Sequence, residues 1–64
     1  MNNENGKALL ARVRAGDLVT LRMPDGSQFT GRAWIGLGMF ATGADGRALR
    51  VTESNILRID PRKG

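Results

Sequence analysis

The first organised pattern along the chain has the spacing of a helix. Apolar residues recur on one helix face and basic residues occupy the other side; the apolar set is Leu9, Leu10 and Val13. The pattern predicts a short amphipathic helix within residues 5–17, with Arg12 and Arg14 in its last turn and a left-handed cap at Gly16. About two helical turns are not stable alone, so we expect the apolar face to lie against the rest of the domain.

Alternation with a period of two follows the predicted helix, and this period is typical of strands. Two alternating runs, residues 19–23 and 29–35, flank the sequence PDG. Its proline presets the first position of a type I turn, and Gly26 can adopt the left-handed conformation that follows. The predicted register places Met23 opposite Ser27. It pairs Leu21 with Phe29 and Val19 with Gly31 on the buried side, and Arg22 with Gln28 and Thr20 with Thr30 outside.

A second hairpin is predicted around Asp45-Gly46, which suits a two-residue type I′ turn. Pairing outward from this turn places Thr42 opposite Leu49 and Phe40 opposite Val51. Gly36 and Gly38 predict a sharp bend of the backbone just before this hairpin. Residues 53–55 predict a turn, after which the closing strand contains Ile56, Leu57 and Ile59. The chain is therefore predicted to be mainly β, with one short N-terminal helix and a bent meander.

The composition narrows the classes of function. Sixty-four residues allow one domain with a small core, and the chain has no cysteine and no histidine. Disulfides, thiolate zinc sites, the commonest metal ligand and the usual general base are therefore absent, so we expect no enzyme activity, no cofactor and no metal. Self-association would bury apolar surface that one subunit leaves exposed, so we expect a homo-oligomer.

The charge balance suits an anionic partner, and the alternative, which the sequence supports equally, is that the charge only keeps the protein in solution. Ten basic against six acidic residues give a net charge of +4, and eight of the ten basic residues are arginines, which bind phosphate and stack on bases. No apolar run approaches the roughly 20 residues of a membrane span, and the start is not typical of a secretory signal, so we expect a cytoplasmic protein. We expect a flexible stretch over residues 1–6, one domain over residues 7–60 and a basic tail over residues 61–64.

Six residues form the candidate set for nucleic-acid binding: Arg22, Arg32, Trp34, Arg47, Asn55 and Arg58. If the alternation persists, Arg22, Arg32 and Trp34 share one side of the first hairpin and place cations beside a flat ring. A bulge at Gly31 would instead turn Trp34 inward, and a role in the core or in a subunit interface is favoured over a stacking platform. Asn55 is interpreted first as a turn cap. Arg47 and Arg58 are candidates for a basic rim; the alternative is that they only face the solvent and bind nothing.

Two segments of this chain follow the order of known family motifs. The positions of V-x-V-x-L-x-x-G-x-x-F-x-G-x-L are filled by Val19, Leu21, Met23, Gly26, Phe29, Gly31 and Ala33, and an Asn-aliphatic-Ile ending is matched by Asn55, Ile56, Leu57 and Ile59. Over residues 8–60 the chain resembles the Sm-like family, including its bacterial Hfq branch, and more loosely the SH3-like barrels. The resemblance implies a strongly bent five-stranded antiparallel barrel after the helix, a ring of subunits, and RNA binding.

The chain departs from that family at the uridine pocket. The positions of the family's RNA-binding loops hold Leu37, Ala41, Thr52 and Glu53, and Asn55 alone matches a pocket residue. Any RNA contact would therefore use other groups. We expect a non-enzymatic, oligomeric protein that binds RNA or another single-stranded nucleic acid. The alternatives are a protein-interaction module that uses an exposed strand edge, and a relative of the small plasmid-borne dihydrofolate reductases, whose Val-Gln-Ile-Tyr pore motif is replaced here by LRVT at residues 49–52.

Overall fold

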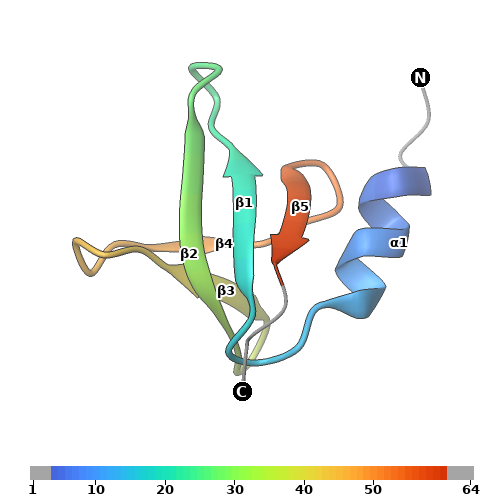
Figure 1. The fold of residues 1–64 in the computed structure, drawn as a ribbon, viewed down its shortest axis with the longest axis horizontal. Coiled ribbons are helices and arrows are strands. Elements are labelled where there is room, and N and C mark those ends of the chain that lie inside the picture. Colours follow the sequence, from blue (N-terminus) through green and yellow to red (C-terminus); the bar gives the residue numbers. More distant parts are fainter. Residues whose placement is uncertain (1–3, 61–64) are drawn as a thin grey trace.

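The computed structural model describes residues 4–60 as one helix and five strands: α1 (Glu4–Arg12), β1 (Leu18–Arg22), β2 (Gln28–Ile35), β3 (Met39–Thr42), β4 (Ala48–Arg50) and β5 (Ile56–Asp60). The strands form one antiparallel sheet with the order β4-β3-β2-β1-β5 (Figure 1). The mainly β class with one short helix is confirmed. Among the described residues β4 and β5 do not pair with each other, so the sheet is open and closure into a barrel stays a prediction.

The first hairpin has the predicted register. Leu21 lies opposite Phe29 and Val19 opposite Gly31, and the Met23 N–H donates to the Ser27 carbonyl over 2.8 Å. Gly26 takes the left-handed conformation with φ 90°. The Ser27 hydroxyl, and then its backbone N–H, donate to the Asp25 carboxylate over 2.6 and 2.9 Å, and these bonds lower the pKa of Asp25 below its ordinary value.

The second hairpin corrects the prediction. Residues 43–47 repeat the turn of residues 23–27: the Gly43 N–H donates to the Arg47 carbonyl over 2.8 Å, and Gly46 has φ 85°. A type I′ turn would also need a positive φ at Asp45, and within residues 4–60 only glycines have one. The loop is therefore one residue longer than predicted. The pairs are Phe40 with Arg50, Ala41 with Leu49 and Thr42 with Ala48.

The helix is confirmed, but its predicted cap is wrong. α1 ends at Arg12, so Arg14 lies beyond its last turn. Gly16, with φ 98°, instead belongs to a β-turn that is closed by a 3.0 Å bond from the Asp17 N–H to the Arg14 carbonyl. The helix also begins at Glu4, inside the stretch expected to be flexible; residues 1–3 and the predicted tail at 61–64 lie outside the described residues.

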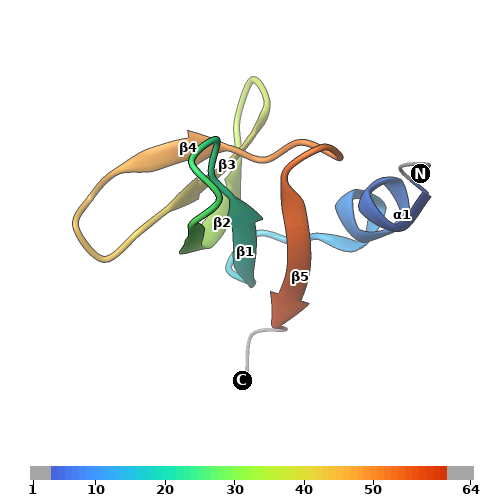
Figure 2. The same ribbon diagram turned by 90° about the horizontal axis from the view of Figure 1, so that it is seen from above.

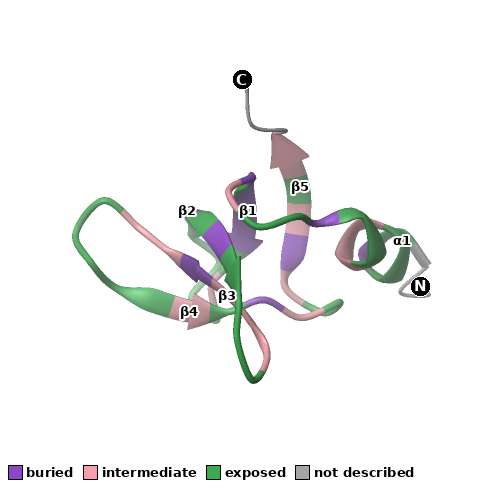
Figure 3. Ribbon diagram, turned by 90° about the horizontal axis from the view of Figure 1, so that it is seen from below, coloured by how far each residue is buried: buried purple, intermediate pink, exposed green. Residues whose placement is uncertain are grey.

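The core lies on the inner face of the sheet. It consists of Val13, Val19, Leu21, Ala33, Ala41, Val51 and Ile56, with Leu9, Leu10, Phe29, Met39, Leu49 and Ile59 packed against it. Buried and exposed residues alternate along β2 (Figure 3). Thr20, predicted to be outside, is buried, and its hydroxyl lies 3.3 Å from that of Thr30.

The helix lies at one end of the molecule. It packs against β5, on the side away from the β3–β4 hairpin (Figure 2). Among the described residues no helix is long and apolar enough to cross a membrane.

Candidate nucleic-acid interface

One row of side chains crosses three strands on the outer face of the sheet. Trp34 of β2 lies opposite Phe40 of β3, which lies opposite Arg50 of β4. The two rings are stacked, with centroids 4.7 Å apart and planes 20° apart, and the Arg50 guanidinium carbon lies 5.9 Å from the Phe40 centroid. We call Trp34, Phe40 and Arg50 the aromatic row. It places a cation and an indole on the same exposed surface.

The Trp34 indole is held in one orientation. Its Nε1–H donates to the Thr42 hydroxyl over 2.8 Å, and the side of the ring system that faces Phe40 is covered by the stack. Trp34 nevertheless remains 43% exposed. Because its one hydrogen-bond donor is already used, the indole presents apolar π surface rather than a polar group.

The placement of Trp34 shows that the core part of the favoured interpretation is wrong, while a place in a subunit interface stays a prediction. The pairing of β1 with β2 continues through Gly31 without a bulge, so Ala33 stays buried and Trp34 stays outside. Glycine is required at position 31 for another reason. A Cβ atom there would lie 2.9 Å from the Phe29 ring and from the Thr42 backbone, because the end of β3 lies close to β2 at this point.

Two of the predicted arginines share this outer face but lie far apart. Arg32 precedes Trp34 by two residues on β2, and its Nη1 donates to the Gly16 carbonyl over 3.3 Å. Arg22 lies opposite Gln28, six residues before Trp34, which is about 20 Å along a strand. The structure therefore groups Arg32 with the aromatic row and leaves Arg22 at the opposite end of the hairpin.

Arg50 was missed at the sequence level. The predicted pairing of Phe40 with Val51 placed Arg50 away from the aromatic residues, whereas the observed register aligns it with Phe40. The repeated x-Asp-Gly-x turn was the signal that could have revealed this, since both hairpins share it.

Arg47 and Arg58 lie apart from the aromatic row and have acidic neighbours. Arg47 Nε lies 3.7 Å from an Asp45 carboxylate oxygen, and Arg58 Nη2 donates to both Asp60 oxygens over 3.0 and 3.1 Å. Both pairs are solvent-exposed, so each stabilises the fold by little. Among the described residues, the arginines without an acidic side chain at ion-pair distance are Arg12, Arg14, Arg22, Arg32 and Arg50.

Asn55 caps the turn before β5. Its Oδ1 accepts from the Thr52 N–H over 2.9 Å, and its Nδ2 donates to the Arg50 carbonyl over 2.8 Å. Its own carbonyl accepts the Arg22 N–H over 2.7 Å. The residue thus ties the ends of β4 and β1 to the turn, in agreement with its interpretation as a cap.

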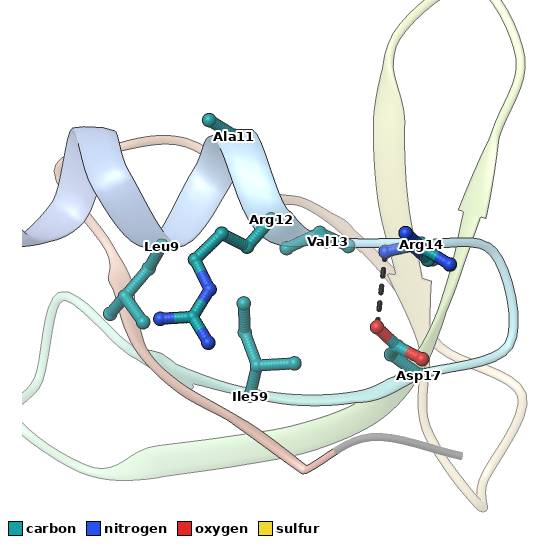
Figure 4. A pocket seen from close by; sticks show the side chains of 7 residues that line it. All are labelled: Leu9, Ala11, Arg12, Val13, Arg14, Asp17 and Ile59. Carbon is teal, nitrogen blue, oxygen red and sulfur yellow. Dashed lines mark hydrogen bonds between the residues drawn. The ribbon is translucent and has the colours of Figure 1, made fainter.

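A groove of about 750 Å³ lies on the other side of the molecule, between α1 and β5 (Figure 4). None of the six predicted residues lines it. Among residues 4–60 no group of acidic side chains could hold a metal ion.

Comparisons of the chain with protein-family models, with curated proteins and with solved structures found no match.

Proposed function

We propose that this protein binds single-stranded nucleic acid, RNA foremost, on the outer face of its sheet and without catalysis. The observation that carries the proposal is an exposed indole that is fixed by Thr42 and stacked on Phe40, with Arg50 near the Phe40 ring and Arg32 two residues away on β2. An unpaired base of any kind can stack on such a surface, and guanidinium groups can hold the phosphates that flank it.

The distribution of charge supports the same proposal. The net charge is +4, and Arg32 and Arg50 are not neutralised by an acidic side chain among the described residues. Phosphate contacts of this kind release counterions, so affinity should fall steeply as salt rises. Base preference should be weak, because the Trp34 N–H is already bonded within the protein.

The proposal includes assembly of the chain into a closed homo-oligomer of Sm-like barrels in the cytoplasm. β4 and β5 are the two edges of the open sheet; α1 packs against β5, and no described strand pairs with the outer side of β4, which could pair with a strand of another chain. The core is small, since among the larger side chains of the described residues only Leu21 and Val19 are fully buried. Assembly would supply the burial that one chain lacks.

Filter binding of labelled oligouridine over a range of salt concentrations tests the proposal. Arg32→Ala should weaken binding and reduce the slope of log affinity against log salt by about one unit. Trp34→Leu should cost about 1–3 kcal/mol at every salt concentration and leave the slope unchanged, because it removes stacking and no charge. Arg47→Ala is the matched control, since Arg47 lies beside Asp45, away from the row. Absence of binding to RNA and DNA even at low salt would overturn the proposal.

A protein-interaction module is the second candidate. Ile35, the last residue of β2, is 58% exposed, and Leu37 in the following turn is fully exposed; two exposed large apolar side chains so close together can mark an interaction surface. The unpaired β4 edge lies in the same half of the sheet. This candidate becomes the better one if low-salt nucleic-acid binding fails.

A further inference from the structure

The groove between α1 and β5 is formed because the helix covers only part of the sheet. Among the strands, α1 makes its main contacts with β5. The space that remains, about 750 Å³, is open on one side and lies within the size range of small-molecule sites. Its lining residues are Leu9, Ala11, Arg12, Val13, Arg14, Asp17 and Ile59.

The floor of the groove is aliphatic. Val13 is buried, and Leu9 and Ile59 are half-buried, so each of the latter two keeps an apolar surface that no other described residue covers. No aromatic ring lines the groove. Its walls can therefore hold an alkyl chain by contact, and they offer no ring on which a base could stack.

The polar groups of the groove are charged and unevenly placed. In Figure 4 the Arg12 guanidinium lies between the side chains of Leu9 and Ile59, over the apolar floor. Arg12 has no acidic side chain at ion-pair distance among the described residues. The carboxylate of the groove, on Asp17, lies near its other end, is 8% exposed and accepts the Arg14 N–H over 3.1 Å.

We propose that this groove binds a small amphipathic carboxylate, of the chemical class of a medium-chain fatty acid. The ligand's carboxylate pairs with the Arg12 guanidinium, and its alkyl chain lies on Leu9 and Ile59. A guanidinium suits this role because it forms two parallel hydrogen bonds with a carboxylate. The site is separate from the aromatic row and does not depend on nucleic-acid binding.

Titration of the full isotopically labelled chain with decanoate, followed by NMR and kept below the micelle concentration, tests the site. The methyl signals of Leu9, Val13 and Ile59 should shift and saturate. Arg12→Gln should weaken binding about threefold, the size expected for loss of one exposed ion pair. Arg12→Lys should bind with intermediate affinity, and Arg47→Gln, which removes an equal charge elsewhere, should bind as the parent chain does.

Three results would overturn the proposal. Decanol that binds as tightly as decanoate would show that Arg12 does not recognise the acid. Shifts confined to Trp34 and Phe40 would place the ligand on the outer face instead. Saturation by an acidic peptide, with no response to decanoate up to the micelle concentration, would mean that the groove is a surface for a protein.

Discussion

At the scale of single residues, the neighbours of a side chain decide what it does. Arg32 and Arg58 are both exposed arginines on strands, yet Arg58 is held by both oxygens of Asp60 and Arg32 bonds only a backbone carbonyl. Asn55 matches a pocket residue of the family motif, but all four of its polar groups are bonded within the chain. The cap at Asn55 was predicted from the sequence, whereas the different partners of the two arginines were not.

Replacing Asn55 by alanine should destabilise the fold more than it affects binding. The change removes the acceptor of the Thr52 N–H and the donor to the Arg50 carbonyl, which should cost about 1–3 kcal/mol in the free energy of unfolding. Urea denaturation measures this cost, and Ser54→Ala in the same turn is the control. An unchanged unfolding midpoint, or a folded variant that no longer binds RNA, would contradict the role of a cap.

At the scale of elements, the two hairpins show when a short turn motif predicts the register of its strands. Pro24 presets the φ of the first position of a type I turn, and it lacks the N–H that a two-residue hairpin at Asp25-Gly26 would need, which made the first register predictable. Ala44, at the equivalent position before Asp45-Gly46, imposes no such limit, and the shorter turn was predicted. An error of one residue in the register of β4 against β3 moves every β4 side chain to the other face of the sheet. For this reason Arg50 was absent from the predicted site.

In α1 a glycine-to-alanine change should have the opposite effect on stability from the usual one. Glycine to alanine inside an exposed helix normally raises stability by about 1 kcal/mol. In this chain Gly6 is buried, and a Cβ there would collide with the Glu53 carbonyl oxygen, so Gly6→Ala should lower the melting temperature. Asn5→Ala, at an exposed position of the same helix, should not lower it. A rise for Gly6→Ala would show that α1 does not rest on the turn before β5.

At the scale of the whole molecule, the order of the strands follows from local pairing, but closure does not. Each hairpin is set by its own turn, while β4 and β5 could meet only through contacts between segments far apart or between chains. Hydrophobic alternation carries no information on such contacts. The class of the sheet was therefore predictable, and the barrel was not.

Light scattering of the purified chain at several concentrations should give the mass of a closed oligomer. A ring of five or more subunits would agree with the Sm-like resemblance, and a tetramer would favour the comparison with the reductases. Leu37→Ser, which changes the fully exposed apolar residue, should leave the mass unchanged if strand edges form the contacts. A monomer at all concentrations would remove the argument for assembly.

The position of Trp34 has a consequence for spectroscopy. It is the one tryptophan of the chain, and it lies on the outer face, stacked on Phe40, rather than in the core. Its fluorescence therefore reports the local state of the β2–β3 hairpin. Loss of the core around Val19 and Leu21 would be better followed by circular dichroism. A fluorescence melting curve with a lower midpoint than the circular dichroism curve would show that the aromatic row opens before the fold is lost.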